Sequence, residues 1–192
     1  MVIGLTGGIA SGKSSVSNIL RKMGVPIFDA DKIAREISEE SVVIEEVALL
    51  FGPEVIGPDG KINRSALKEL VFSDGEKLAA LNKLIHPRVI ARFEEIRNKI
   101  PAGARVVFDI PLLFESGLEF LCDKILVVDV QEGVQIERLL ARDHISPALA
   151  REIIAAQLPL SEKKKRADFV IENNGNPEDL RLAVLALRER IL

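Results

Sequence analysis

The sequence predicts an α/β fold in which five parallel strands form one sheet that helices cover on both faces. Short apolar runs rich in β-branched residues recur along the chain, and helical patterns separate them. Such strands are typical of parallel sheets that are buried on both sides. The 192 residues suit one compact domain with insertions. The sequence contains no apolar run near the roughly 20 residues that a membrane helix needs, so no membrane partner is expected.

The first elements are a strand, a glycine-rich loop and a helix. The strand is expected at residues 2–5, and Gly7 and Gly8 end it. Beyond Gly12 the apolar residues recur with helical spacing, and Gly24 would end the helix as its C-cap. The spacing of apolar residues therefore changes from strand to helix across this loop.

The later part of the chain is expected to supply the other strands and a helical insertion. Between the second and third strands, residues 32–100 are mostly helical by pattern. Within them, Pro58-Asp59-Gly60 is a turn signal that suggests a small hairpin. The further strands are expected at residues 25–28, 105–108, 125–130 and 169–171.

The glycine-rich loop carries the most specific motif. Residues 7–14 read Gly-Gly-Ile-Ala-Ser-Gly-Lys-Ser and match G-x-x-x-x-G-K-[ST], the phosphate-binding P-loop. Its glycines let successive N–H groups surround a phosphate, and the following helix points its positive end at the same anion. A plain glycine-rich turn is disfavoured because the motif lies between a strand and a helix. The expected nucleotide-binding residues are Gly8, Ile9, Ala10, Ser11, Gly12, Lys13, Ser14 and Ser15, with Lys13 on the β and γ phosphates and Ser14 on Mg²⁺.

Carboxylates follow two of the expected strands. Asp29 and Asp31 lie at the carboxyl end of the second strand, where open α/β sheets bind ligands. Asp31 is our candidate for the base that takes the proton of an attacking hydroxyl, whereas Asp29 is equally well explained as a helix cap. Asp109 ends the third strand and suits either a Mg²⁺ carboxylate or a structural role. Whether Asp31 or Asp109 lies nearer the metal is left open.

Two arginines share one face of the helix after the fourth strand. Gln135, Arg138 and Arg142 stand at i, i+3 and i+7. Two guanidinium groups one turn apart could hold the oxygens of a migrating phosphoryl group. Surface pairing of the arginines with Glu137 or Asp143 explains the spacing equally well.

Two other features are interpreted without a catalytic role. His86-Pro87 interrupts a helical stripe, and a single histidine at such a helix break is more often a cap than a catalyst. The basic run Lys163-Lys164-Lys165-Arg166 is interpreted as a solvated helix end in preference to a phosphate contact.

Composition excludes several classes of protein. With 26 basic and 29 acidic residues the net charge is −3, so the positive field of a nonspecific nucleic-acid binder is absent. Tyr and Trp are absent too, which removes most stacking platforms for single strands, and no nucleic-acid partner is expected. The single cysteine cannot form an intrachain disulfide, and the two histidines show no zinc-ligand spacing. A reducing cytoplasm is therefore the expected location.

These residues together resemble the dephospho-CoA kinase family, and the resemblance covers nearly the whole chain. The family's usual pattern has Gly where this chain has Ala10 and Thr where it has Ser15, and neither change removes a donor that the chemistry needs. The resembling segments are residues 4–14, 29–31, 85–87 and 111–115, Gln135 with Arg138 and Arg142, and residues 167–175.

The resemblance implies transfer of the ATP γ-phosphoryl group, with Mg²⁺, to the ribose 3′-hydroxyl of dephospho-CoA. It implies a P-loop kinase-like nucleotide-binding core (residues 1–31, 101–137 and 168–192), an acceptor-binding region (32–100) and a helical lid (138–167). Asp31 would be the base, Lys13, Arg138 and Arg142 would contact phosphates, and Asn173 would lie near the adenine. The expected metal ligands are Ser14 and Asp109, and the expected acceptor contacts are Thr6, Asp31, Arg64, His86, Leu113 and Glu115. A monomer or weak homo-oligomer is expected.

Two rival functions remain at this point. Another P-loop kinase, acting on a nucleotide or nucleoside, would share the loop, the magnesium and an arginine lid. A GTP-dependent switch needs a guanine-reading Asn-Lys-x-Asp motif, and neither Asn82-Lys83 nor Asn98-Lys99 is followed by Asp at that spacing.

Overall fold

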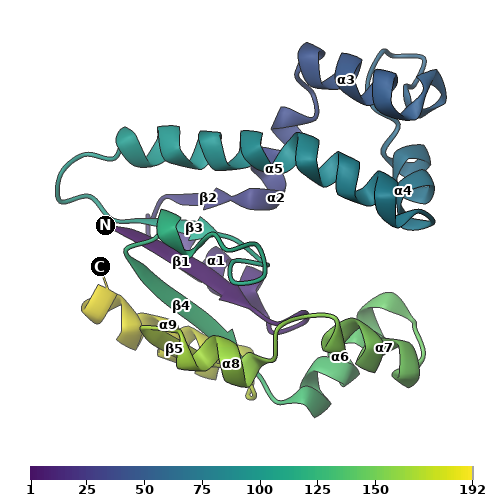
Figure 1. Cartoon of the computed structure of the whole chain (residues 1–192). Coiled ribbons are helices and arrows are strands. Elements are labelled where there is room, and N and C mark those ends of the chain that lie inside the picture. Colours follow the sequence, from purple (N-terminus) through teal and green to yellow (C-terminus); the bar gives the residue numbers. More distant parts are fainter. Residues whose placement is uncertain (192) are drawn as a thin grey trace. The chain divides into compact units, whose positions relative to one another are not determined.

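The computed structural model describes residues 1–191 and confirms the predicted parallel sheet of five strands (Figure 1). The strands are β1 (Val2–Gly7), β2 (Ile27–Asp29), β3 (Val106–Asp109), β4 (Lys124–Asp129) and β5 (Phe169–Glu172). Their order is β2-β3-β1-β4-β5, and every neighbouring pair is parallel. β1 is the central strand and all six of its residues are buried, which explains its continuous apolar run.

α-Helices lie in three of the connections between successive strands, and the connection from β3 to β4 contains only a 3₁₀ turn. The α-helices are α1 (Lys13–Lys22), α2 (Ala30–Ile37), α3 (Ser41–Phe51), α4 (Arg64–Phe72), α5 (Gly75–Asn98), α6 (Glu132–Asp143), α7 (Pro147–Ala155), α8 (Leu160–Lys165) and α9 (Pro177–Ile191), with 3₁₀ turns at Pro53–Val55 and Glu119–Leu121. Within residues 1–191, no helix is both long and apolar enough to cross a bilayer. Leu192, the last residue of the predicted core segment 168–192, lies outside the described residues.

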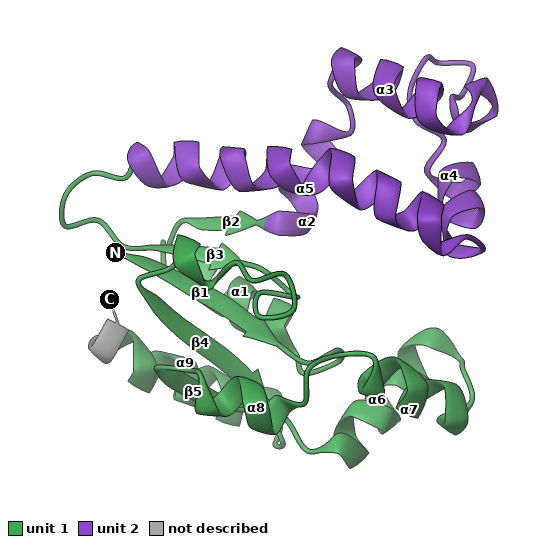
Figure 2. Cartoon of the chain, viewed as in Figure 1, with its two compact units in different colours: residues 1–29, 100–192 green, residues 30–99 purple. Residues whose placement is uncertain are grey.

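The chain divides into two compact units (Figure 2). Unit 1 contains Met1–Asp29 and the chain from Ile100 onward, and therefore the whole sheet. Unit 2 is Ala30–Lys99 and consists mainly of helices. The insertion expected at residues 32–100 differs from unit 2 by two residues at its start and one at its end. The functions expected of these segments stay predictions.

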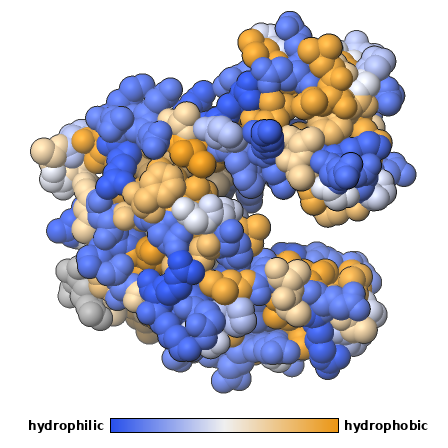
Figure 3. Space-filling model, viewed as in Figure 1, coloured by the Kyte–Doolittle hydropathy of each residue, from blue (hydrophilic) through white to orange (hydrophobic). Residues whose placement is uncertain are grey.

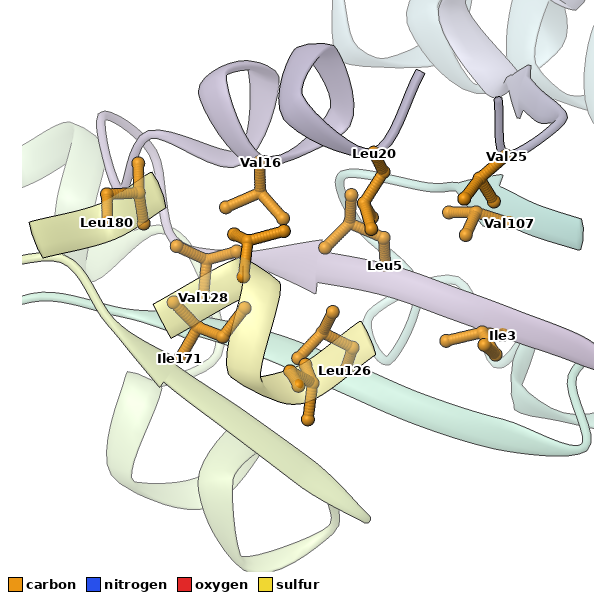
Figure 4. Packing of buried hydrophobic residues seen from close by; sticks show 12 residues of the cluster. Ile3, Leu5, Val16, Leu20, Val25, Val107, Leu126, Val128, Ile171 and Leu180 are labelled. Atoms are coloured by element: carbon orange, nitrogen blue, oxygen red, sulfur yellow. The ribbon is translucent and has the colours of Figure 1, made fainter. Parts of the chain in front are cut away.

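One face of the sheet in unit 1 packs against α1 and α9 (Figure 4). Val16 and Leu20 of α1 and Leu180 and Val184 of α9 are almost completely buried there. They contact the strand residues Ile3, Leu5, Val107, Leu126, Val128 and Ile171. This packing holds the start of α1, directly after the glycine-rich loop, in a fixed position against the carboxyl end of β1.

Unit 2 has its own core, in which α2, α3 and α4 pack on α5. Ile56 and Ile62 form an antiparallel bridge around the predicted turn. The small hairpin is therefore confirmed, with this bridge in place of two full strands. Some apolar side chains of α3 and α4 stay exposed, and Figure 3 shows them as orange atoms over these helices. They include Val42, Leu49, Leu50 and Phe72.

The helix break expected at His86-Pro87 is wrong, because α5 continues through Pro87. Proline removes one hydrogen bond of a helix and typically costs about 3 kcal/mol inside it. Here Leu84, Val89 and Phe93 on either side are buried, and this packing outweighs the local cost. The Arg88 guanidinium also donates to the Leu84 carbonyl at 2.8 Å and adds a hydrogen bond near the proline.

Gly4 of β1 lies where a side chain has no room. A Cβ atom at this position would lie 2.6 Å from Cys122 Sγ and 3.1 Å from Leu113 Cδ2. We expect Gly4→Ala to lower the free energy of unfolding by about 1–3 kcal/mol, because overpacking displaces buried neighbours. Denaturant titration followed by circular dichroism measures this loss.

The matched control is Gly133→Ala, because nothing lies within 4 Å of a Cβ atom at that position. This control should not lower stability. Adding Cys122→Ala to Gly4→Ala should recover much of the loss, since Sγ is the nearest obstacle. A single Gly4→Ala variant as stable as the native chain would contradict this packing.

Candidate active site

The predicted P-loop lies between β1 and α1, and its backbone takes the left-handed conformations that the motif requires. Gly12 has φ of 89°, and a Cβ atom there would lie 2.1 Å from Asn173 Nδ2. Only glycine satisfies both conditions. Ala10 has φ of 56°, so alanine occupies a conformation that glycine adopts without strain. The departure at Ala10 therefore costs conformational energy but keeps the loop's shape.

Side chains from α6 hold the carbonyl groups of this loop. Gln135 is 3% exposed and its Nε2 donates to the Ile9 carbonyl at 2.7 Å. The Arg138 guanidinium donates to the carbonyls of Ala10 and Ser11 at 3.2 and 3.4 Å. Loop carbonyls that would otherwise lack partners are thus satisfied by α6.

Asn173 holds the same loop from the end of β5. It is 6% exposed, and its Nδ2 donates to the Ser11 carbonyl at 2.7 Å. The backbone carbonyl of Asn173 accepts from Arg138 at 2.9 Å. The backbone N–H of Asn173 donates to the Asp129 carbonyl at 2.8 Å. Asn173 is therefore fixed on three sides and links the carboxyl ends of β4 and β5 to the loop.

These contacts orient the loop's amide groups. In a trans peptide the carbonyl and the following N–H point in opposite directions, and the structure has no cis peptide among the described residues. Holding the carbonyls of Ile9 and Ser11 from one side turns the N–H groups of Ala10 and Gly12 to the other side. No side chain caps the start of α1, so its first amides are left for a ligand. This arrangement suits an anion such as a phosphate.

A pocket of about 830 Å³ adjoins the loop at Gly12. Asn173 and Arg138 line one part of it, and the beginning of α9 lines another. Its walls mix apolar and polar groups, which suits a flat heteroaromatic ring. Other lining residues are Ser15, Asn18, Ile19, Gly175, Asn176 and Pro177.

Lys13 and Asp109 form an ion pair below the loop. Asp109 is 2% exposed and accepts from both the Lys13 ammonium and the Ser17 hydroxyl. In the register of β2 and β3, Asp29 lies opposite Asp109, so two predicted carboxylates do end adjacent strands. Asp31 lies in the first turn of α2, which begins unit 2.

The site offers few ligands for Mg²⁺, but they are oxygen atoms, which this ion prefers. Among the described residues, no group of three or more His, Cys, Asp or Glu could hold a metal ion. Mg²⁺ in kinases commonly takes one or two protein oxygens and completes its shell with phosphates and water. The Ser14 hydroxyl on the exposed first turn of α1 and the Asp109 carboxylate fit that pattern.

The two predicted arginines of α6 are used differently. Arg138 contacts the loop carbonyls, whereas Arg142 is 58% exposed and forms a bidentate pair with Asp143, both contacts being 2.8 Å. The hydrogen bond with Asp143 raises the pKa of Arg142, and the same bond lowers the pKa of Asp143. The structure therefore shows surface pairing for Arg142, and contact with phosphates stays a proposal.

The expected acceptor contacts are scattered in the structure. Thr6 and Leu113 are completely buried, and the Thr6 hydroxyl donates to the Pro111 carbonyl at 2.9 Å. Both belong to the core of unit 1, and their expected contact with a substrate stays a prediction. In unit 2, Arg64 bonds Glu39 at 3.2 Å and His86 is exposed on α5.

The interpretation of the basic run as solvated is wrong for Lys163. Its side chain is completely buried and forms an ion pair with Glu115 at 2.7 Å. The three basic residues that follow are also paired. Lys164 contacts the buried Asp129 at 2.7 Å, Lys165 contacts Glu162 at the surface at 2.7 Å, and Arg166 contacts Glu119. No local pattern separates Lys163 from its neighbours, because its partner comes from a distant loop.

Comparisons with known proteins confirm the resemblance. The sequence matches the family described as Dephospho-CoA kinase over residues 1–179. A dephospho-CoA kinase of Fusobacterium nucleatum is 51% identical over 180 residues, which cover 94% of this chain and 93% of that protein. The crystal structure of TT1252 from Thermus thermophilus is similar at a TM-score of 0.81 and 38% identity, covering 100% of this chain and 98% of that chain. The structure of a dephospho-CoA kinase from Campylobacter jejuni is similar at 0.77 and 29%, covering 99% and 96%.

These matches extend over nearly the full length of the chain and of its relatives. The matched segment includes the P-loop, the carboxylates Asp29, Asp31 and Asp109, and the loop residue Asn173. The fold and the site therefore agree with one assignment, and the chain belongs to the dephospho-CoA kinase family.

Proposed function

We propose that this chain transfers the γ-phosphoryl group of ATP to the ribose 3′-hydroxyl of dephospho-CoA, giving CoA and ADP. The single observation that carries the proposal is the P-loop, in which side chains hold the carbonyls and leave amides for a triphosphate. Family membership supplies the acceptor, since relatives over the full chain are dephospho-CoA kinases. This reaction completes the biosynthesis of CoA.

ATP would occupy the loop and the adjoining pocket of unit 1. The amides of Ala10, Gly12, Lys13 and Ser14 would face the β-phosphate, with the positive end of α1 behind them. The adenine would lie near Asn173 in the pocket at Gly12. Lys13 would exchange Asp109 for phosphate oxygens, because a triphosphate offers more negative charge than one carboxylate.

Mg²⁺ would be held by Ser14, with Asp109 acting directly or through water. When bound, the ion neutralises charge on the β and γ phosphates. The Asp109 carboxylate would be freed for this purpose when Lys13 turns to the nucleotide. Ser17 would keep its hydrogen bond to Asp109 and hold the carboxylate in place.

Asp31 is proposed as the base. The acceptor's 3′-oxygen attacks the γ-phosphorus, the bond from that phosphorus to the β–γ bridging oxygen breaks, and ADP leaves. The proton of the 3′-hydroxyl passes to the Asp31 carboxylate. Asp31 suits this role because it follows Asp29 by two residues, and Asp29 lies opposite Asp109 at the carboxyl ends of β2 and β3.

The remaining roles follow the segments that the sequence predicts. Residues 32–100 would bind the acceptor, with Arg64 and His86 as contacts, and Glu115 would contribute from unit 1. Residues 138–167 would act as a lid that excludes water, because transfer to an alcohol must outcompete transfer to water. Within the lid, Arg138 and Arg142 would neutralise phosphate charge. We further propose a cytoplasmic monomer or weak homo-oligomer.

Acceptor profiling tests the proposed reaction. The chain is incubated with ATP and Mg²⁺, alone or with dephospho-CoA, adenosine or AMP, and ADP is measured. We expect ADP formation with dephospho-CoA and little without an acceptor. The Lys13→Ala variant, which should lose about 100-fold in turnover, serves as the blank. Equal or greater turnover with adenosine or AMP would assign the chain to a different acceptor.

Replacing Asp31 tests the base. We expect Asp31→Asn to lower turnover at saturating substrates by about 100-fold or more, because the amide cannot accept the hydroxyl proton. Initial rates measured against both substrates separate kcat from KM. Asp29→Asn is the matched comparison on the same segment and should lose less. Near-normal turnover of Asp31→Asn would rule out the base assignment.

Replacing Arg142 distinguishes catalysis from surface pairing. If Arg142 contacts the migrating phosphoryl group, Arg142→Ala should lower kcat more than it weakens ATP binding. Asp143→Ala is the control, since it breaks the same surface pair but leaves the guanidinium. Unchanged turnover of Arg142→Ala would leave the pair with Asp143 as the only role of Arg142.

A further inference from the structure

The first half of the P-loop contacts the segment that joins α7 to α8 and enters α8. The Ile9 amide donates to Gln157 Oε1 at 2.8 Å. A Cβ atom at Gly8 would lie 3.2 Å from the Leu160 side chain and 2.7 Å from Gln135 Nε2, so this part of the loop is in close contact. The segment 157–163 therefore lies directly against the loop.

Lys163 anchors this segment at the end of β1. Its ammonium donates to the Gly7 carbonyl at 3.2 Å and pairs with Glu115 at 2.7 Å, with no exposure of the side chain. Glu115 Oε1 also accepts from the Leu158 amide at 3.1 Å. One carboxylate thus holds both Lys163 and the start of its segment.

We propose that Lys163 is a positioning residue for the phosphate-binding loop, acting through the carbonyl of Gly7 with Glu115 as its counter-charge. The bond fixes the plane of the peptide between Gly7 and Gly8, where the strand turns into the loop. This proposal rests on the proposed function only in taking the loop as the nucleotide site.

The contacts favour orientation over long-range attraction as the role of Lys163. The neighbouring Glu115 carboxylate cancels most of the ammonium's field at a phosphate. A carbonyl that loses a charged donor, in contrast, holds its peptide plane less firmly. Removing Lys163 should therefore weaken phosphate binding mainly by changing the geometry of the loop. The loss of its positive charge should matter less.

The experiment uses three variants of the full chain. Lys163→Met removes the donor and leaves the partly exposed Glu115 carboxylate without its lysine partner. The double variant Lys163→Met with Glu115→Gln removes that charge as well and keeps an oxygen for Leu158. Lys165→Met is the control, because Lys165 lies on the same helix and pairs with Glu162 at the surface.

Two quantities are measured for each variant. The midpoint of thermal unfolding should fall by roughly 5 °C in Lys163→Met, because the partly exposed Glu115 carboxylate loses its partner, and should largely return in the double variant. Calorimetry gives the Kd of a non-hydrolysable ATP analogue in the presence of Mg²⁺. This Kd should rise about 10-fold in Lys163→Met and in the double variant. Lys165→Met should change neither quantity.

A raised Kd in both variants, with stability recovered in the double variant, supports the proposal, because both variants lose the Gly7 contact and only the single variant keeps an unpaired Glu115 carboxylate. If the double variant recovers nucleotide affinity together with stability, Lys163 has a structural role alone and the proposal is wrong. An unchanged Kd in Lys163→Met also overturns it. The acceptor assay of the native chain is independent, since analogue binding does not depend on which acceptor the enzyme uses.

Discussion

The structure depends on one constraint, which is that the amides of a phosphate-binding loop face inward only when its carbonyls are held from outside. In this chain the donors come from separate places: Gln135 and Arg138 on α6, Asn173 after β5, and Lys163 on α8. Each donor replaces water on a carbonyl that burial would otherwise leave unsatisfied. Elements far apart in the sequence are therefore needed to build a site whose motif is eight residues long.

The same constraint explains how an acidic protein can bind a strongly anionic ligand. The net charge is −3, and the two lysines at the loop have carboxylate partners, Lys13 with Asp109 and Lys163 with Glu115. Backbone amides and the positive end of α1 add an attraction for phosphate that does not depend on net charge. A backbone site of this kind needs no basic surface.

The boundary between the two units falls within the proposed catalytic segment. Asp29 ends β2 in unit 1, and Ala30 begins α2 in unit 2, which carries Asp31. The residues proposed for the donor thus belong to the sheet unit, whereas the base and most acceptor contacts belong to the helical unit.

The sequence alone determined the sheet, the P-loop and the order of the elements, because apolar periodicity and the motif's spacing are local signals. It could not determine the roles of Lys163 and Arg142, since basic residues on neighbouring helices look alike until a partner is known. The tertiary structure placed Lys163 inside, beside Glu115, and Arg142 outside, beside Asp143. It also kept α5 continuous through Pro87, because packing of buried side chains on both sides outweighs the propensity that local sequence expresses.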